Sequence, residues 1–331
     1  MVSVARRKVF MLSLLCMMML VAACSSGDAG TRDKATPAAS GEQVEATETP
    51  AGDQEPATRM LETVKGNIEV PTNPQRVVVL YMLGDVLAFD VTPAGVSGVY
   101  QGAAFEQDLA DVPKLGEWFE PNREVILELN PDLIIVPSEE TYQILKDIAP
   151  TVLLNYFDAP LEERIRQVGE ALGKESQVSA LLEAFYLKVE DGKQRLAEAG
   201  LLDKTVTIVE GGKGSMGVVA SKDYGRGSQI IYEYLGMKAP DILQQEIDAA
   251  TGANGLDISF ETLESYIGDI VFRSSYEGMF DLSDHAIWNN IPAVKEGRLI
   301  EISFGLSYYN DIFSLDKQLD FIVDSLLSLK E

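Results

Sequence analysis

The stretch LEERIRQVGEALGKESQVSALLEAFYLKVEDGKQRLAEAG, residues 161–200, decides the fold of this chain. It carries no strand signal, is rich in helix-forming residues, and places apolar residues at helical spacing, as at Val178, Leu182 and Phe185. On both sides of it, short β-rich runs alternate with segments of helical period. We therefore expect two α/β lobes joined by a long bridging helix near residues 175–200, with a ligand cleft between the lobes.

Five short apolar runs outside that stretch are predicted to be buried strands. They alternate with helical patterns, which predicts largely parallel sheets covered on both faces. One such helical pattern, residues 229–235, is ended by Gly236. The runs are RVVVL (76–80), DLIIV (132–136), VTIVE (206–210), DIVF (269–272) and RLIEI (298–302).

An internal repeat supports the two lobes: PNREVILELNPDLIIV (121–136) and DISFETLESYIGDIVF (257–272). Each begins with a good helix N-cap, Asn122 or Ser259, and continues through a glutamate to an aspartate and a strand. The helix dipole favours Glu124 and Glu261 in such a first turn. Two interpretations stay open, namely dipole complementarity alone or a pair of matching exposed carboxylates, one on each lobe.

The N-terminus has the features of an export signal. Three basic residues, 6–8, precede an apolar run at 9–23, whose helical length of roughly 22 Å is short for a bilayer core of about 30 Å. The sequence Val-Ala-Ala-Cys ending at Cys24 resembles the lipobox of bacterial lipoproteins. That resemblance implies cleavage after residue 23 and a diacylglyceryl group on Cys24, which would hold the mature protein on a membrane.

The expected domain boundaries follow from this pattern. Residues 24–57 combine the lipidated cysteine with a polar, low-complexity tether, predicted to be disordered, with a reach on the order of 30 Å. The folded part comprises an N-terminal lobe at 58–170, the bridging helix at 171–200 and a C-terminal lobe at 201–331.

Composition excludes several functions. The net charge of −25 provides no basic stripe for nucleic acid. The one histidine, His285, and the absence of cysteine after Cys24 argue against a multi-histidine or cysteine metal site; we expect His285 to be solvated or to cap a helix, with haem ligation as the remaining possibility. GGKGSMG at 211–217 has dinucleotide-like glycine spacing but precedes a β-prone run, which favours a turn between strands or a pocket loop. The sequence has no motif of a catalytic nucleophile, so nothing in it indicates an enzyme.

Two segments are better suited to binding. KDYGRGSQIIYEYLG (222–236) places an aromatic residue and an arginine around two glycines ahead of a helix, and FGLSYYND (304–311) follows the last predicted strand. Both lie where ligands bind in open α/β sheets, beyond the carboxyl ends of strands. Adjacent tyrosines at 308 and 309 cannot both point inward along one face, which favours a pocket role over a core role.

Four features taken together resemble one known family: the lipobox, the segment at 121–136, the YGRG turn and the ending IWNNIPAVKEGRLIEI...SYYNDIFSLD. The family that they resemble is the siderophore-binding lipoproteins of ABC iron importers, a class related to cobalamin and haem receptors. The resemblance implies that Tyr224 packs on a siderophore and that Arg226 bonds its iron-coordinating oxygens, although tryptophan is familiar at the position of Tyr224. It implies pocket roles for Tyr308 and Tyr309. Weaker candidates in the first lobe are Tyr81, Tyr100 and Trp118.

The same resemblance implies that Glu124 and Glu261 meet arginines of a dimeric membrane permease. Catecholate and citrate complexes of iron are anionic, whereas this chain offers few cations in an acidic frame, so a neutral or cationic ferric hydroxamate is the expected cargo. The expected protein is a monomer without cofactor or enzymatic activity, anchored on the outer face of the cytoplasmic membrane of a Gram-positive cell. The alternatives are a catecholate, haem or cobalamin receptor, an extracellular hydrolase, or a structural surface lipoprotein.

Overall fold

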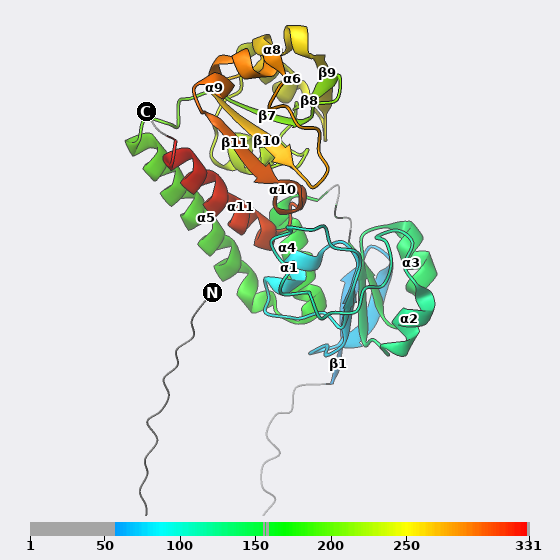
Figure 1. Cartoon of the computed structure of the whole chain (residues 1–331). Coiled ribbons are helices and arrows are strands. Elements are labelled where there is room, and N and C mark those ends of the chain that lie inside the picture. Colours follow the sequence, from blue (N-terminus) through cyan, green and yellow to red (C-terminus); the bar gives the residue numbers. More distant parts are fainter. Residues whose placement is uncertain (1–56, 155, 157–158, 330–331) are drawn as a thin grey trace, which may run out of the picture. The chain divides into compact units, whose positions relative to one another are not determined.

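The computed structural model describes residues 57–154, 156 and 159–329 (Figure 1). The expected signal at 1–23, the lipidation site Cys24 and residues 25–56 of the expected tether lie outside the described residues. Among the residues described, none of the helices combines the length and the apolar character needed to cross a membrane.

The N-terminal lobe is built on a parallel four-stranded sheet with the strand order β4-β3-β5-β6. Its central strands consist of buried β-branched and leucine side chains, as expected for a sheet covered on both faces. An antiparallel hairpin, β1-β2, precedes this sheet. The elements are β1 (Thr58–Thr63), β2 (Gly66–Pro71), β3 (Val77–Val79), α1 (Leu83–Leu87), β4 (Gly95–Val96), α2 (Arg123–Glu128), β5 (Leu133–Val136), α3 (Glu139–Leu145), β6 (Thr151–Leu153) and α4 (Leu161–Leu172).

The segment that decides the fold forms two helices. Helix α4 ends at Gly173, whose φ of +69° is the left-handed conformation common at helix ends. Helix α5 (Glu175–Glu198) then runs for 24 residues and lies along α11 (Ile312–Leu327) (Figure 1). A side chain at Gly192 would come within 3.0 Å of Val323, so the glycine allows the two helices to approach closely.

The C-terminal lobe has a mixed five-stranded sheet with the order β11-β10-β7-β8-β9. Strands β7, β10 and β11 are parallel, and β8 is antiparallel to both of its neighbours. Before α11, its elements are β7 (Val206–Gly211), β8 (Ser215–Val219), η1 (Gln229–Tyr234), α6 (Asp241–Ala249), β9 (Gly255–Ser259), α7 (Phe260–Leu263), η2 (Glu264–Tyr266), β10 (Ile270–Ser275), α8 (Ala286–Asn290), α9 (Pro292–Lys295), β11 (Leu299–Ser303) and α10 (Phe304–Tyr308).

The expected α/β fold with two lobes and a long bridging helix is confirmed, and all five predicted strands are present, as β3, β5, β7, β10 and β11. The glycine-rich segment forms the turn between antiparallel β7 and β8, as predicted. Gly211, Gly212 and Gly214 have φ values of +86°, +127° and +92° there, which only glycine adopts readily. Strands β1, β2, β4, β6, β8 and β9 were not among the five predicted runs.

The repeated aspartates have the same structural role in both lobes. Asp132, just before β5, accepts the backbone N–H groups of Gln75 and Arg76 at 2.8 and 2.9 Å. Asp269, just before β10, accepts the backbone N–H and the hydroxyl of Thr205, both at 2.9 Å. In each lobe the aspartate therefore fixes the chain that enters the neighbouring parallel strand, β3 or β7. This is why the repeat has an aspartate at that position.

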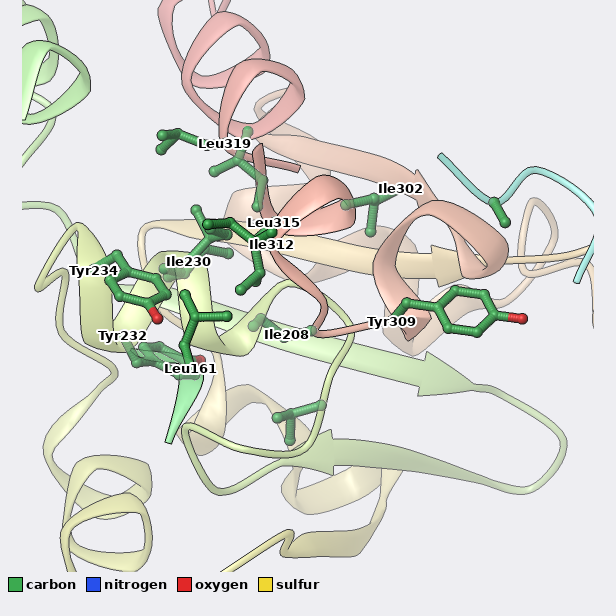
Figure 2. Close-up of a cluster of buried hydrophobic side chains, with 14 of the residues drawn as sticks. Leu161, Ile208, Ile230, Tyr232, Tyr234, Ile302, Tyr309, Ile312, Leu315 and Leu319 are labelled. Carbon is green, nitrogen blue, oxygen red and sulfur yellow. The ribbon is translucent and has the colours of Figure 1, made fainter. Parts of the chain in front are cut away.

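Apolar side chains of α11 build the core behind the C-terminal sheet. Figure 2 shows Ile312 and Leu315 of α11 next to Ile230 of η1, with Ile208 of β7 nearby, and all four are at most 2% exposed. Helix η1 has π-helical winding, since the backbone N–H of Leu235 donates to the carbonyl oxygen of Ile230 at 2.8 Å. Such short π-helical turns are uncommon and frequently mark functional sites.

Candidate functional site

The YGRG turn has a backbone that its glycines make possible. Gly225, Arg226 and Gly227 all have positive φ, at +87°, +60° and +83°. A Cβ at Gly225 would lie 3.1 Å from the carbonyl oxygen of Tyr308, and the backbone N–H of Arg226 donates to the carbonyl of Ser307 at 2.5 Å. The turn is therefore held directly against helix α10, and the arginine at its centre has an uncommon left-handed conformation, typical of functional positions.

Arg226 is part of a small charged network. Its Nε donates to Oε2 of Glu210 at 2.6 Å, and the hydroxyl of Tyr224 donates to Oε1 of the same carboxylate at 2.7 Å. The guanidinium also lies 4.3 Å from the ring centroid of Phe304, in cation–π contact. Burial, assisted by the bond to Glu210, raises the pKa of Tyr224 to about 12, so this hydroxyl stays protonated and donating.

Glu210 is absent from the residues predicted for the site. It is the penultimate residue of strand β7, directly after four buried residues, and its side chain is 23% exposed against 12% for Arg226. One feature of the sequence could have revealed Glu210: a charged residue near the carboxyl end of a mostly apolar strand, which is where ligands bind in α/β sheets.

Aromatic side chains of both lobes form one connected cluster around Tyr100. The ring centroid of Tyr100 lies 4.7 Å from that of Tyr308 and 5.4 Å from that of Trp118, with the rings edge to face. Trp118 and Tyr81 are 5.0 Å apart, again edge to face. Such geometry is favourable for aromatic pairs. We call this set the aromatic cluster: Tyr81, Tyr100, Trp118, Phe304, Tyr308 and Tyr309.

The structure brings the seven ligand-contact residues expected from the sequence together in this region. Five belong to the aromatic cluster, and the other two, Tyr224 and Arg226, reach it because the guanidinium lies 5.5 Å from the Tyr224 ring and 5.4 Å from the Tyr308 ring. Tyr81 lies two residues after the end of β3 and has a φ of +71°, which is rare for an aromatic residue. The candidate site therefore lies at the carboxyl ends of strands from both lobes.

Tyr309 differs from the expectation that it lines a pocket. It is 0% exposed, its hydroxyl accepts the backbone N–H of Tyr100 at 3.2 Å, and its carbonyl accepts Nε2 of Gln318 at 2.6 Å. Tyr308 is half-buried in the cluster. Only one of the adjacent tyrosines is a core residue, and in this structure Tyr309 supports Tyr100 from behind, with no surface of its own for a ligand.

Two cavities adjoin the cluster. The first, about 640 Å³, lies beyond the ends of β10 and β11 and is lined by Tyr100, Phe304 and Tyr276, among others. The second, about 430 Å³, shares Tyr81, Tyr224 and Tyr308 with the predicted site. Both volumes are within the range of small-molecule sites.

A buried ionic group lies between α1, α4 and α11. Asp85 and Asp311 are 0% and 1% exposed, and Arg164 approaches Asp85 to 3.6 Å. Asp85 also accepts the backbone N–H of Ile312 at 3.0 Å, so it holds the first turn of α11. Burial, together with the neighbouring charge of Asp85, raises the pKa of Asp311 to about 7.

The two repeated glutamates remain on the surface. Glu124 and Glu261 are exposed and stand in the first turns of α2 and α7. Asn122 caps α2 through its side chain, whereas Ser259 occupies the N-cap position of α7 without a side-chain bond to its backbone. A bond from its own backbone N–H and another from the Ser259 hydroxyl lower the pKa of Glu261.

His285 has a structural role of the expected kind. It is the N-cap of α8, its Nδ1 accepts the backbone N–H of Trp288 at 3.3 Å, and its ring lies 3.9 Å from that of Phe260. Within 57–154, 156 and 159–329, no group of three histidine, cysteine, aspartate or glutamate residues could hold a metal ion.

Comparison with known proteins places the chain in a family. Residues 70–304 match the family model described as periplasmic binding protein. The iron(3+)-hydroxamate-binding protein YxeB of Bacillus subtilis is 30% identical over 328 residues, 96% of each chain. A solved structure of the FhuD fold family, a component of a Fep/Fec-like ferrichrome ABC transporter from Bacillus subtilis, is 30% identical with a TM-score of 0.70, covering 78% of this chain and 98% of that one.

A second solved structure carries a ligand. It is FhuD2 of Staphylococcus aureus with bound ferrioxamine B, 25% identical with a TM-score of 0.66, and the match covers 77% of this chain and 99% of that one. The family match extends from strand β2 of the N-terminal lobe to the first residue of α10. The chain belongs to the periplasmic binding protein family.

Proposed function

We propose that this protein is the substrate-binding lipoprotein of an ABC importer and that it captures a ferric hydroxamate siderophore in the aromatic cluster. One observation carries the proposal: Arg226, held in a left-handed turn, presents its guanidinium to a ring of tyrosine, tryptophan and phenylalanine contributed by both lobes. Its Nε bonds Glu210, and we expect the two Nη groups to donate to the oxygens that coordinate iron.

The charge of the site favours a hydroxamate over an anionic siderophore. The arginine that would meet the iron-bound oxygens is already paired with Glu210, 2.6 Å away, so the site has little excess positive charge. An anionic catecholate or citrate complex would meet the carboxylate of Glu210 at close range without a further cation to offset its own charge, which costs on the order of a few kcal/mol at an intermediate dielectric. The names of YxeB and of the ferrioxamine-bound FhuD2 support the same ligand class.

Delivery to a membrane permease completes the proposal. Glu124 and Glu261 are exposed and occupy equivalent places in the two lobes, which suits docking on a permease dimer through its arginines. Lipid on Cys24 would keep the monomeric protein within reach of that permease on the outer face of the membrane. The protein does no chemistry on its cargo and carries no resident cofactor.

Fluorescence titration tests the ligand assignment. We expect ferrioxamine B or ferrichrome to quench Trp118 at micromolar concentration, because this indole lies in the aromatic cluster. The other tryptophan, Trp288, is 2% exposed, so a Trp118→Phe variant should lose most of the signal while keeping binding by calorimetry. Binding of a ferric catecholate, haem or cobalamin in place of both hydroxamates would overturn the assignment.

An uptake assay tests docking separately. The double variant Glu124→Ala/Glu261→Ala should bind the siderophore normally in calorimetry but support little import of radioactive iron. Both side chains are exposed, so the fold should be unaffected. Unchanged import in the double variant would refute the docking role, and Glu128→Ala, an exposed glutamate on the same helix α2, is the control.

A further inference from the structure

The second cavity, lined by Tyr81, Tyr224 and Tyr308 among others, also has several carboxylate and amide groups in its lining. Three carboxylate residues line it: Glu162 from α4, Asp223 beside the YGRG turn, and Glu233 from η1. The cavity has a volume of about 430 Å³ and shares tyrosines with the aromatic cluster. A group bound there would therefore be adjacent to the proposed siderophore site.

Gln229 of η1 provides the second, independent observation. Its side chain lines the cavity and is 9% exposed, yet its Oε1 has no hydrogen-bond partner among the described residues. The buried Oδ1 of Asn310, which lines the same cavity, is likewise without a partner there. Buried acceptors are rarely left unpaired in folded proteins, so two of them on residues that line one cavity point to a ligand that donates hydrogen bonds.

The three carboxylates that line the cavity differ in whether a nearby group of the protein stabilises their charge. Glu162 stands in the first turn of α4, where the helix dipole favours it, and it accepts the hydroxyl of Tyr186. Asp223 and Glu233 have no ion pair within the part of the chain that the structure describes. Partial burial, together with the charge of Asp223, raises the pKa of Glu233, although a hydrogen bond from Gln229 opposes this effect.

The neighbouring cations do not neutralise the carboxylates that line the cavity. Arg164 also lines the cavity, but its guanidinium faces the buried carboxylate of Asp85 at 3.6 Å and donates to the carbonyl oxygen of Asn310. Lys222 is exposed and attracts Glu233 without forming an ion pair. The carboxylates that line the cavity therefore outnumber the cations near it.

The chemistry of the cavity selects an organic cation over a metal ion. The acidic residues do not converge closely enough for a metal site anywhere in the described residues. A primary ammonium carries three donors, which matches carboxylate and amide oxygens, and its carbon chain packs well against tyrosine rings.

We propose that this cavity is a subsite for a protonated amine arm of the siderophore, with Asp223, Glu233 and Gln229 as its receptors. The proposal rests on the function proposed above and refines it: the protein prefers ferric hydroxamates that carry a free primary amine. The iron centre would lie at Arg226 and the aromatic cluster, and the amine would reach past Tyr308 into the cavity.

Calorimetry on the full chain in detergent, with two ligands that differ only at the amine, tests this subsite. Ferrioxamine B has a free ammonium, and N-acetylferrioxamine B has the same iron centre with the amine capped. We expect the wild-type protein to bind ferrioxamine B about tenfold more tightly at neutral pH and low salt. In Asp223→Asn/Glu233→Gln the ratio should fall to about one, through loss of affinity for ferrioxamine B alone.

The control variant is Glu264→Gln/Asp284→Asn, which removes the same charge from exposed positions that line neither cavity and should keep the preference. Gln229→Leu, of similar size, should weaken ferrioxamine B selectively even if the charge variant folds poorly. Equal wild-type affinity for the two ligands would overturn the subsite while leaving the proposed function intact. Failure of both ligands to bind wild-type protein would overturn both.

Discussion

The two lobes contribute different chemistry to one site. Both lobes supply rings, but the N-terminal lobe supplies rings alone, Tyr81, Tyr100 and Trp118, whereas the C-terminal lobe adds the ionic pair Arg226–Glu210 to its own. Aromatic faces accept many ligand shapes, while an arginine fixed by a carboxylate requires oxygens at defined places. Under the proposed function, we expect the first lobe to adapt to the ligand and the second to recognise its iron-bound oxygens.

The lobes nevertheless share a framework. In both of them an aspartate that precedes a central strand binds the chain entering the neighbouring strand, through Asp132 in one and Asp269 in the other. The lobes thus diverge in the segments that follow their strands and agree in those that precede them. Function in such a sheet lies at the carboxyl ends of the strands, and stability depends on the opposite ends.

The largest expected effect comes from Arg226→Ala. Removing the guanidinium takes away the donors proposed for the iron-bound oxygens and leaves the carboxylate of Glu210 without its partner at 2.6 Å. We expect affinity for ferrioxamine B to fall by about 100-fold in calorimetry. Arg226→Lys should recover only part of it, because an ammonium cannot reproduce the planar fork. A loss below threefold would contradict the assignment of recognition to the C-terminal lobe.

Next in size, Asp132→Ala and Asp269→Ala test whether the lobes are held alike. Each variant removes the acceptor of two hydrogen bonds at 2.8 to 2.9 Å, so the free energy of unfolding should fall by about 2 kcal/mol in either. Urea unfolding measures this, with the exposed Asp257→Ala as control. A large loss of unfolding free energy in only one variant would show that the aspartate stabilises one lobe much more than the other.

The contact between the lobes has a pH dependence of predictable sign. Asp311 has its pKa raised from 3.8 to about 7 in the folded protein. Between about pH 4 and 7 the folded state therefore keeps a proton that the unfolded chain has already released. Stability should therefore fall as pH rises through this window, by about 2 kcal/mol between pH 5 and 8. Asp311→Asn keeps a good N-cap for α11 and should flatten the urea-unfolding profile.

The smallest expected effect is on the N-terminal side of the site. Trp118→Ala should weaken ferrioxamine B about tenfold, since one edge of the aromatic cluster is lost while Arg226 remains. Trp118→Phe should cost less than threefold, as an adaptable aromatic wall would allow. If Trp118→Ala proved as damaging as Arg226→Ala, the proposed division between the lobes would be wrong.

Local sequence patterns predicted much of the framework. Buried strands such as 132–136 are continuous apolar runs, and the helix at 175–198 has an apolar face, so each signal lies within its own segment. The edge strand β9 was missed because it is short, has no fully buried residue despite its alternation, and ends at the helix N-cap Ser259. The hairpin β1-β2 is mostly exposed and has little apolar content to reveal it.

The site was predictable only in part. Tyr224, Arg226 and Tyr308 stand in motifs that can be seen locally, but Glu210 acquires its meaning from an arginine 16 positions away. The burial of Tyr309 likewise depends on Tyr100, 209 positions earlier. Long-range pairings of this kind leave no periodic trace in the sequence.

Helix α5 also bears on how an importer could sense loading. With 24 residues it is about 36 Å long, and it stays in contact with α11 through close packing at Gly192. A continuous helix cannot fold sharply without losing backbone hydrogen bonds, so the lobes cannot swing widely about it. Small-angle scattering should give nearly the same radius of gyration with and without siderophore. A permease would then have to distinguish loaded from empty protein by slight differences in the spacing of Glu124 and Glu261.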